Sequence, residues 1–431
     1  MQIDALRRID RYAGIPLCWA SSIMRRLYVS IWGERLPPKP EKVLIIKLSE
    51  MGSTVLAYPA LAELKRRCPD VQLYFLVFVK NAAIVEILKL TSVQNIITVD
   101  YGTPWALLSS GLRAMLRLFR ERIDTAIDMD LFSRLTALIS FFVCRGNRVG
   151  FHRYNDEGLY RGDLLTHRVL YSPQIHTSAA FIVLIRSLFE KANDEPYYRG
   201  AVDPGDLVIP IYQPEAIEME SIRQKLSSAG VKVGAHTIVL INPNSSDIFP
   251  LRKWPLKHYA QLCRQLLDKI PQCALVITGV SSERKDARYL LEQVDCAQCV
   301  DFTGKTSFRE LLALYSMAAG MVTNDSGPAH FASLLRLPTV VLFGPETPRL
   351  YSPLGDKHKD MYSNFACSPC VSVYNGKKSP CRENRCLIAI TPESVLAALL
   401  GLLDGAQGVP PRTVPKRFDL DLTAASESAR R

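Results

Sequence analysis

The sequence predicts an α/β protein with two parallel-sheet domains in tandem. Short, continuously apolar runs such as residues 43–46 and 339–344 are typical of strands buried on both faces of a parallel sheet. These runs alternate with helical patterns along most of the chain, which indicates repeated βαβ units. With 431 residues, the chain is long enough for two sizeable domains.

Composition narrows the class of protein. The chain is 48% hydrophobic and 22% charged, which is ordinary for a soluble globular protein. Its 53 basic and 42 acidic residues give a net charge of +11, which favours anionic partners such as phosphorylated sugars or anionic lipids. We find no nucleic-acid-binding motif and expect no nucleic acid partner. No signal peptide or membrane-spanning apolar run is evident, so we expect a cytoplasmic location.

The alternation of elements divides the chain into domains. The predicted strands of the N-terminal domain are residues 43–46, 72–79, 96–99 and 125–128, and those of the C-terminal domain are residues 237–241, 274–279, 321–323 and 339–344. We expect a helix at 392–403 to cross back onto the N-terminal domain. The predicted parts are an N-terminal segment (1–40), the N-terminal domain (41–205), a proline-punctuated linker (206–235), the C-terminal domain (236–390), a C-terminal helix (391–404) and a disordered tail (405–431).

Two basic amphipathic stretches suggest contact with a membrane. In residues 1–40, Trp19 and Trp32 lie among apolar residues interleaved with Arg25 and Arg26, a pattern that suits a helix lying in a bilayer surface. The alternative is a helix packed on the protein's own surface. Residues 105–123 carry arginines beside an apolar stripe, which could face an anionic headgroup or simply be a solvated charged face.

The stretch 322–330 has the pattern of a ligand-binding turn. It begins as a buried strand, turns at Asp325 and Ser326, which suit a helix N-cap, and continues into a helix. Gly327 lets the backbone approach a ligand closely, and the free N–H groups of a helix start suit a diphosphate. His330 lies one turn into the helix. An ordinary capped strand-to-helix turn has the same local pattern.

Other motifs occur in a fixed order around this turn. They are Lys47-Leu-Ser-Glu-Met-Gly-Ser53, Asn242-Pro-Asn-Ser after a predicted strand, Arg252-Lys-Trp-Pro, and Glu283 after the strand at 274–279. With the turn at Asp325, this ordered set resembles the ADP-heptose:lipopolysaccharide heptosyltransferase family (glycosyltransferase family 9). The resemblance covers about residues 41–400.

The resemblance implies a fold and an activity. It implies the GT-B fold, with two Rossmann-like domains and the active site in the cleft between them. A sugar, expected to be heptose from ADP-heptose, would move with inversion onto a lipopolysaccharide core or related glycolipid at the inner face of the cytoplasmic membrane. No cofactor would be needed for catalysis, because protein charges can neutralise the departing diphosphate. Alternatives are transfer from another nucleotide sugar in cell-surface polysaccharide synthesis, and a non-catalytic glycan- or membrane-binding protein.

The resemblance also assigns donor-binding residues. Lys253 would approach the phosphates, although it could also be a surface lysine. The backbone at Ser326 and Gly327 would cradle the diphosphate beside His330, and Asp325 would bind sugar hydroxyls. The remaining donor-side candidates are Asn242 and Glu283, the latter a looser match for a ribose contact.

The turn at 47–53 departs from the family pattern on the acceptor side. The family has an aspartate, taken as the general base, where this chain has Ser53, whose hydroxyl pKa is too high for that role. Glu50 could act as the base if the turn aims it into the cleft. A non-catalytic Glu50, and another carboxylate such as Asp128 or Asp130, stay open as alternatives. The acceptor-side candidates are therefore Ser49, Gly52, Ser53 and Asp128, with Glu50 and Lys253 as catalytic candidates.

Four of the eleven cysteines cluster late in the chain. Cys367, Cys370, Cys381 and Cys386 fall within twenty residues rich in Gly and Pro, which suits a small loop closed by a tetrahedral metal. In a cytoplasmic protein, a metal is favoured over disulfides. We therefore predict a possible structural zinc, with reduced thiols, two disulfides or an iron–sulfur cluster as alternatives.

Overall fold

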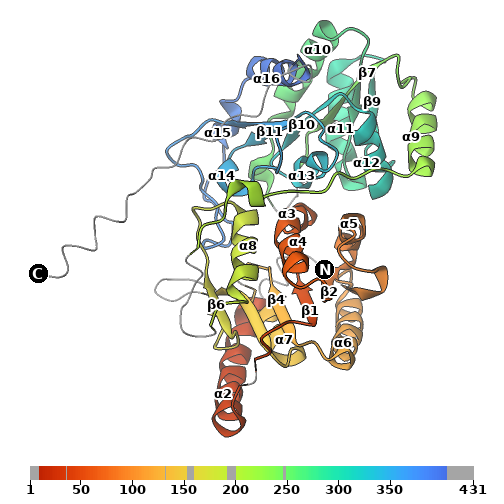
Figure 1. The fold of residues 1–431 in the computed structure, drawn as a ribbon. Helices are drawn as coiled ribbons and strands as arrows, with labels where there is room; N and C mark the ends of the chain where they lie inside the picture. Colours follow the sequence, from red (N-terminus) through yellow and green to blue (C-terminus); the bar gives the residue numbers. More distant parts are fainter. Residues whose placement is uncertain are drawn as a thin grey trace, which may run out of the picture.

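The computed structural model describes residues 9–34, 36–131, 133–152, 160–191, 200–245 and 249–404. The predicted tail at 405–431 and the first eight residues lie outside this range. The described chain forms two α/β domains, one above the other, with the N-terminal helix α2 extending from the far end of the N-terminal domain (Figure 1).

The N-terminal domain is built on a sheet of six parallel strands in the order β3-β2-β1-β4-β5-β6. The strands are β1 (Lys42–Ile46), β2 (Gln72–Phe78), β3 (Ile96–Val99), β4 (Thr125–Asp128), β5 (Asn147–His152) and β6 (His167–Leu170). The helices of this domain are α2 (Gly14–Trp32), α3 (Met51–Leu56), α4 (Tyr58–Arg67), α5 (Ala82–Leu88), α6 (Pro104–Glu121), α7 (Arg134–Val143) and α8 (Thr177–Ser187).

The C-terminal domain repeats this plan with a second sheet of six parallel strands, in the order β12-β11-β10-β7-β8-β9. The strands are β7 (Thr237–Asn242), β8 (Cys273–Ile277), β9 (Cys299–Asp301), β10 (Gly320–Asn324), β11 (Thr339–Phe343) and β12 (His358–Tyr362). The helices are α9 (Ala216–Ser228), α10 (Leu256–Lys269), α11 (Arg284–Val294), α12 (Phe308–Met317), α13 (Gly327–Ser333), α14 (Pro348–Tyr351), α15 (Arg385–Ile388) and α16 (Pro392–Asp404). Short 3₁₀ turns lie at Val79–Asn81, Val93–Asn95, Pro204–Asp206, Pro250–Arg252 and Ser281–Glu283.

In each sheet the chain starts at a central strand, builds outward on one side, and then crosses to the other side. The reversal falls between β1 and β4 in the first sheet and between β7 and β10 in the second. Open parallel sheets of this kind bind ligands at the carboxyl ends of the strands beside the reversal. The predicted fold of two Rossmann-like domains is confirmed, and the strand order marks where each domain would hold a ligand.

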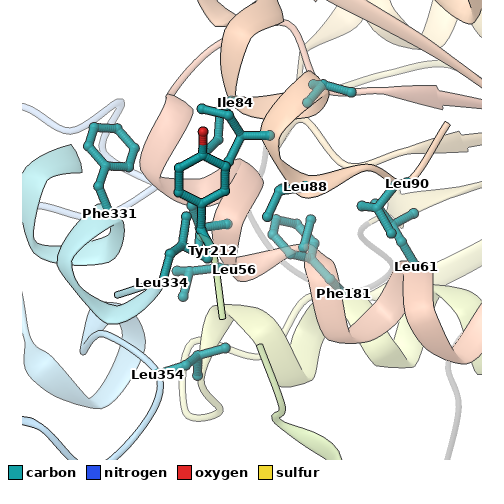
Figure 2. Close-up of a cluster of buried hydrophobic side chains, with 14 of the residues drawn as sticks. Leu56, Leu61, Ile84, Leu88, Leu90, Phe181, Tyr212, Phe331, Leu334 and Leu354 are labelled. Atoms are coloured by element: carbon teal, nitrogen blue, oxygen red, sulfur yellow. The ribbon is translucent and has the colours of Figure 1, made fainter. Parts of the chain in front are cut away.

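An apolar cluster joins the two domains. Leu56 and Phe181 of the N-terminal domain and Phe331, Leu334 and Leu354 of the C-terminal domain belong to one buried cluster (Figure 2). The linker takes part as well, because the Tyr212 amide donates to the Leu334 carbonyl at 2.8 Å. A shared core of this kind holds the domains together and brings their facing loops into contact.

Polar contacts cross the same interface. The His176 ring, at the start of α8, lies 2.9 Å from the carbonyl oxygen of Ser352. On the opposite side of the domain pair, Arg309 of α12 lies 3.3 Å from the Glu86 carboxylate of α5. Because hydrogen bonds and ion pairs are directional, these two contacts fix the relative orientation of the two domains across the apolar cluster.

Two features of the helices refine the sequence-based picture, and one expectation is wrong. The segment between β1 and β2 forms two helices, α3 and α4, with Pro59 in the first turn of α4, where its missing N–H does no harm. Helix α9, inside the predicted linker, packs on α12 of the C-terminal domain. The expectation that the last helix crosses to the N-terminal domain is wrong: α16 packs on α10 and on the sheet of its own domain, where Val395 and Leu399 are buried (Figure 1).

Candidate active site at the domain interface

The turn that follows β1 is fixed by a buried aspartate. The Lys47 ammonium lies 2.9 Å from Oδ1 of Asp130, and the Leu48 amide donates to Oδ2 of Asp130 at 2.9 Å. Lys47 also donates to the Ser49 carbonyl at 2.7 Å. Glu50 then takes the left-handed conformation, with φ of 68°, and α3 begins. Asp130 therefore has a structural role in positioning the turn.

Gly52 is the point where this turn meets the C-terminal domain. A Cβ atom at position 52 would lie 2.6 Å from Cδ2 of His330 and 3.1 Å from the Gly327 Cα atom. A side chain there would force α3 and α13 apart, so glycine is required by close packing and not by its backbone angles. The structure thus brings Gly52, an acceptor-side candidate, into contact with Gly327 and His330, which are donor-side candidates.

The Glu50 side chain contacts a lysine from the other domain. Its Oε1 atom lies 2.8 Å from Nζ of Lys377, whose side chain is 14% exposed, whereas that of Glu50 is 48% exposed. The Lys377 ammonium holds the pKa of the Glu50 carboxyl well below its usual range. Ser53, buried beneath, donates to the Glu50 carbonyl at 2.9 Å. Glu50 is therefore an ionised group with a fixed cationic partner.

Asp325 lies at the end of β10, beside the strand reversal, and is almost fully buried. Burial raises the pKa of its carboxyl, and Nη1 of Arg252 lies 3.5 Å from Oδ2. The guanidinium carbon of Arg252 lies 4.8 Å from the centre of the Phe249 ring, a cation–π geometry that orients it. The pair puts a positive and a negative group at the sheet edge where a ligand is expected.

His330 is buried against the turn at Gly52. Burial lowers the pKa of its imidazole to about 3, so the ring is neutral at physiological pH. Its Nδ1 atom has no hydrogen-bond partner among the described residues. A neutral ring can donate one hydrogen bond and accept another. His330 can therefore contact a ligand without adding a second full charge beside Arg252.

A second group of unpaired polar atoms lies at the ends of β7, β8 and β9. Both polar side-chain atoms of Asn244, and the Thr303 hydroxyl, are buried without a partner in the described part of the chain. A Cβ atom at Gly279 would lie 3.0 Å from Nδ2 of Asn244 and 2.7 Å from Oε2 of Glu283. Glu283 also accepts from the Val280 amide at 2.8 Å. Because Gly279 has no side chain, Asn244 and Glu283 can both approach its Cα atom.

Three predicted site residues are engaged within the protein. The Asn242 amide donates to the Thr278 carbonyl at 3.1 Å and so ties β7 to β8. Nζ of Lys253 lies 3.3 Å from Oδ2 of Asp286 on α11. Asp128 is fully buried, and its carboxylate pairs with the Arg161 guanidinium and accepts from the Thr136 hydroxyl at 2.7 Å.

Asp128 therefore does not face the cleft. Burial raises the pKa of its carboxyl to about 6 even beside Arg161. Ser326, by contrast, lies between β10 and α13, where its hydroxyl donates to the Asn324 carbonyl at 3.2 Å.

The four-cysteine loop contains Lys377, the residue that contacts Glu50 of the other domain. Cys367 and Cys381 are exposed, Cys370 is half-buried and accepts from the Ser379 hydroxyl at 3.2 Å, and Cys386 is buried. Across the described residues, His, Cys, Asp and Glu side chains form no group of three or more arranged to hold a metal. The structural zinc stays a prediction, which metal analysis of the purified protein would test.

Several residues of this site were not among the sequence-based candidates. Arg252 adjoins Lys253 in a motif already singled out, and Asn244 lies two residues beyond Asn242, so a local signal existed for both. Glu346 follows β11, where the carboxyl-end rule could have indicated it. No signal marks Lys377, because it lies in an irregular loop between cysteines.

Two Rossmann-like domains facing each other across polar strand ends form the GT-B arrangement. The family model for glycosyltransferase family 9 (heptosyltransferase) matches residues 113–379. The chain therefore belongs to glycosyltransferase family 9, and the protein is a glycosyltransferase.

Individual relatives agree with this assignment. The chain is 26% identical over 365 residues to lipooligosaccharide heptosyltransferase 2 of Haemophilus influenzae, covering 84% of this chain and 99% of that protein. The solved structure of Escherichia coli ADP-heptose lipopolysaccharide heptosyltransferase II superposes with a TM-score of 0.66 at 22% identity, covering 85% of this chain and all of the other. The E. coli heptosyltransferase WaaC with ADP superposes with a TM-score of 0.59 at 16% identity, covering 84% and 99%.

Proposed function

We propose that this protein transfers a heptose from ADP-heptose, with inversion, to a lipopolysaccharide core or a related glycolipid. The names of its relatives support the sugar and the acceptor class, and a structural neighbour solved with ADP supports the nucleotide. The observation that carries the proposal is the set of buried polar groups at the strand ends of the C-terminal domain that have no hydrogen-bond partner among the described residues. Such groups are rare in folded proteins unless a ligand or water satisfies them.

The donor would lie along these strand ends. Asn244, Thr303 and Glu283 would contact the nucleoside, and Asp325 the sugar hydroxyls. His330 and the backbone at residues 326 and 327 would contact the diphosphate. The departing diphosphate gains negative charge during transfer, and preorganised positive groups stabilise that charge. Arg252 and Lys377 are already held at this position, and Lys253 would join them by leaving Asp286.

Thermal unfolding with nucleoside diphosphates tests donor binding. A ligand at a hundred times its dissociation constant stabilises the native state by about 2.7 kcal/mol. We expect ADP to raise the melting temperature and UDP, GDP and CDP to have little effect. Lys253→Ala should reduce the ADP-induced shift. The matched control is Lys257→Ala, an exposed lysine on the following helix, which should leave the shift unchanged.

Transfer itself is measured with ADP-heptose and a heptose-deficient lipopolysaccharide acceptor, by mass spectrometry of the glycolipid. Addition of one heptose per acceptor supports the proposal. A melting shift with another nucleotide, together with transfer from the corresponding nucleotide sugar, would show that this nucleotide sugar, and not ADP-heptose, is the donor. An absence of any shift and of any transfer would contradict the proposed function.

We also propose that the N-terminal domain docks on an anionic membrane surface at its cytoplasmic face. Helix α2 has an inverted distribution of side chains, because Ser21, Ser22 and Arg25 face the protein and its apolar residues face outward. Arg25 is held by Glu34 at 2.6 Å and by Asp163 at 3.2 Å. The outward apolar side chains, all more than half exposed, are Leu17, Trp19, Leu27, Tyr28, Ile31 and Trp32. Exposed apolar side chains that gather on one helix in this way indicate a binding face.

Two helices of the same domain, α6 and α7, also expose apolar side chains. Helix α7 packs on α2 and on α6, and it exposes Leu135 and Phe142. On α6 the exposed apolar residues fall three or four positions apart: Trp105, Leu108, Leu112, Leu116 and Phe119. Arginines on α6 accompany this stripe. An apolar stripe bordered by cations suits the headgroup region of an anionic bilayer. In the described part of the chain, no helix is long and apolar enough to cross a membrane.

Sedimentation with lipid vesicles tests this surface. We expect the protein to bind vesicles containing phosphatidylglycerol more strongly than vesicles of phosphatidylcholine alone. The triple change Leu27→Ser, Ile31→Ser and Trp32→Ser should weaken binding at least tenfold. Ile217→Ser is the control, since Ile217 is 76% exposed on α9 of the other domain. Equal binding by the triple variant and the native protein would contradict a docking role for α2.

A further inference from the structure

The acceptor hydroxyl must lose a proton during transfer, and the carboxylate that the family uses for this step is absent. Ser53 occupies that position, and its hydroxyl is bound to the Glu50 carbonyl. Glu50 is ionised beside Lys377 at 2.8 Å, and that cation makes its carboxylate a weak base. The Asp128 carboxylate is buried and paired with the Arg161 guanidinium. The reaction therefore needs a carboxylate from elsewhere in the cleft.

Glu346 lies at the carboxyl end of β11, on the same sheet edge as Asp325. Strands β10 and β11 are paired neighbours, with Asn324 opposite Leu342, so the segments that follow them emerge side by side. The turn that carries Glu346 is held on both sides. The Pro345 carbonyl accepts from the Cys370 amide at 3.0 Å, and Thr347 caps α14. The position of Glu346 is therefore defined by the sheet and by the cysteine-rich loop.

The Glu346 side chain is buried beside the charged groups of the domain interface. Glu346 is 3% exposed, and no hydrogen bond or ion pair joins its carboxyl group to another residue that the structure describes. The charged and titratable groups within electrostatic range of it are Lys377, Arg252, Asp325, Glu50, Tyr171 and Tyr351. Burying a carboxyl group without a partner is costly, so its presence at a cleft indicates a function.

We propose that Glu346 is the general base that accepts the proton of the acceptor hydroxyl, and that Glu50 is a positioning residue that holds Lys377 in the cleft. This inference rests on the proposed glycosyl transfer, and it assigns the proton-transfer step of that reaction. Glu346 reaches the cleft from the donor-binding domain, whereas the family's base lies on the acceptor-side turn.

The proton and electron pairs balance in one displacement. An oxygen lone pair of the acceptor hydroxyl forms the new bond to the anomeric carbon. The bond from that carbon to the diphosphate oxygen breaks, and its electron pair leaves with the nucleoside diphosphate. The O–H proton passes to the Glu346 carboxylate, which becomes a carboxylic acid and later releases the proton to water. Lys377 remains an ammonium and neutralises the leaving group.

The electrostatics of the two glutamates suit this division of roles. Burial raises the pKa of Glu346 to about 8, whereas Lys377 lowers that of Glu50. A general base works best when its pKa lies near the working pH, because it is then both available and basic enough. Environments that separate the pKa values of two neighbouring acids commonly mark the one that exchanges the proton.

Steady-state transfer by the full-length chain tests the assignment. General-base loss typically lowers rates by about 10²–10⁴-fold, so we expect Glu346→Gln to lower kcat by at least about 100-fold. The ADP-induced melting shift should be retained in this variant. In the native protein, kcat should rise with pH up to about 8, and this rise should disappear in Glu346→Gln. Glu346→Asp should restore part of the activity, and Glu50→Gln should mainly raise KM.

The assignment is overturned if Glu346→Gln keeps kcat within threefold of the native value with the same pH profile. It is also overturned if Glu50→Gln, and not Glu346→Gln, abolishes the pH dependence. An infrared titration does not depend on turnover, so it tests the role of Glu346 even if the native protein transfers no heptose. That absence of transfer would contradict the proposed function but not the assignment of Glu346. A protonated-carboxyl band that disappears near pH 8, and that Glu346→Gln lacks, supports the role of Glu346; its absence overturns it.

Discussion

The two domains have the same strand order but use their polar residues differently at the strand reversal. In the N-terminal domain, Lys47 pairs with Asp130 and Asp128 pairs with Arg161, so the buried charges there satisfy one another. At the equivalent place in the C-terminal domain, polar atoms of Asn244, Thr303, Asp325 and His330 are buried without hydrogen-bond partners among the described residues. The two carboxylates at the first edge have cationic partners from their own domain, whereas the second edge presents several polar atoms that a ligand can satisfy.

This difference shows how a repeated fold divides one binding task. An unpaired buried polar group costs about 1–3 kcal/mol, so several together are tolerated only where a ligand or water completes them. The self-paired groups of the N-terminal domain act on geometry, since they hold the turn that presses Gly52 against His330. We therefore expect substitutions at the first edge to change stability and substitutions at the second to change ligand binding.

The largest expected effect is on the buried pair of the N-terminal domain. Arg161→Met removes the cation and leaves the Asp128 carboxylate buried without its partner. Breaking a buried ion pair in this way costs about 3–5 kcal/mol, and we expect a loss of that size in the free energy of unfolding by urea. Arg288→Met, at an exposed arginine of α11, is the control and should change stability by less than about 0.5 kcal/mol. If the Arg161 variant were as stable as the native protein, the pair would have no role in holding this edge.

A smaller effect is expected at His330, which burial keeps neutral with a pKa of about 3. In the unfolded chain its pKa is about 6.5, so below that pH the unfolded state binds a proton that the folded state does not. Stability must therefore fall as the pH is lowered, and between pH 6.5 and 5 His330 contributes about 2 kcal/mol of that loss.

Unfolding by urea at the two pH values measures this contribution. His330→Asn should reduce the acid-induced loss of stability by about 2 kcal/mol. The control is His236→Asn, at a turn almost one hundred residues before His330 in the sequence. This variant should lose stability on acidification as the native protein does. Equal acid sensitivity in the His330 variant and the native protein would show that the imidazole is accessible to protons in the folded state.

Local patterns in the sequence identify most of the fold and the turn at Asp325. Apolar runs mark the strands because both faces of each parallel sheet are buried, and the Ser-Gly-Pro chemistry of the turn is contained within a few residues. Strands β5, β6 and β12 escaped prediction. Each contains several polar or charged residues, so the continuous apolar signal is broken, and each strand is paired with its neighbour in the sheet.

Contacts between the domains could not be predicted in the same way. Lys377 and Glu50 lie 327 residues apart and meet only because the domains pack together. The same packing explains Gly52, whose neighbour is a histidine of the other domain. The departure at Ser53 was visible in the sequence, but the carboxylate that replaces the missing one could be sought only after the strands had been placed. Glu346 became a candidate through its burial and because no residue that the structure describes forms a hydrogen bond with its carboxyl group.

The smallest expected effect separates two asparagines of one motif. Asn242 ties β7 to β8, whereas the Asn244 side chain has no partner among the described residues. Asn244→Ala should leave the free energy of unfolding nearly unchanged and weaken ADP binding about tenfold, as expected for the loss of about 1.4 kcal/mol of hydrogen bonding. Asn242→Ala should do the reverse, lowering stability by about 1 kcal/mol. Calorimetric titration with ADP and urea unfolding of both variants measure the two effects. If Asn242→Ala weakened ADP binding more than Asn244→Ala, the unpaired atoms would not mark the ligand site, and the contrast between the two sheet edges would lose its meaning.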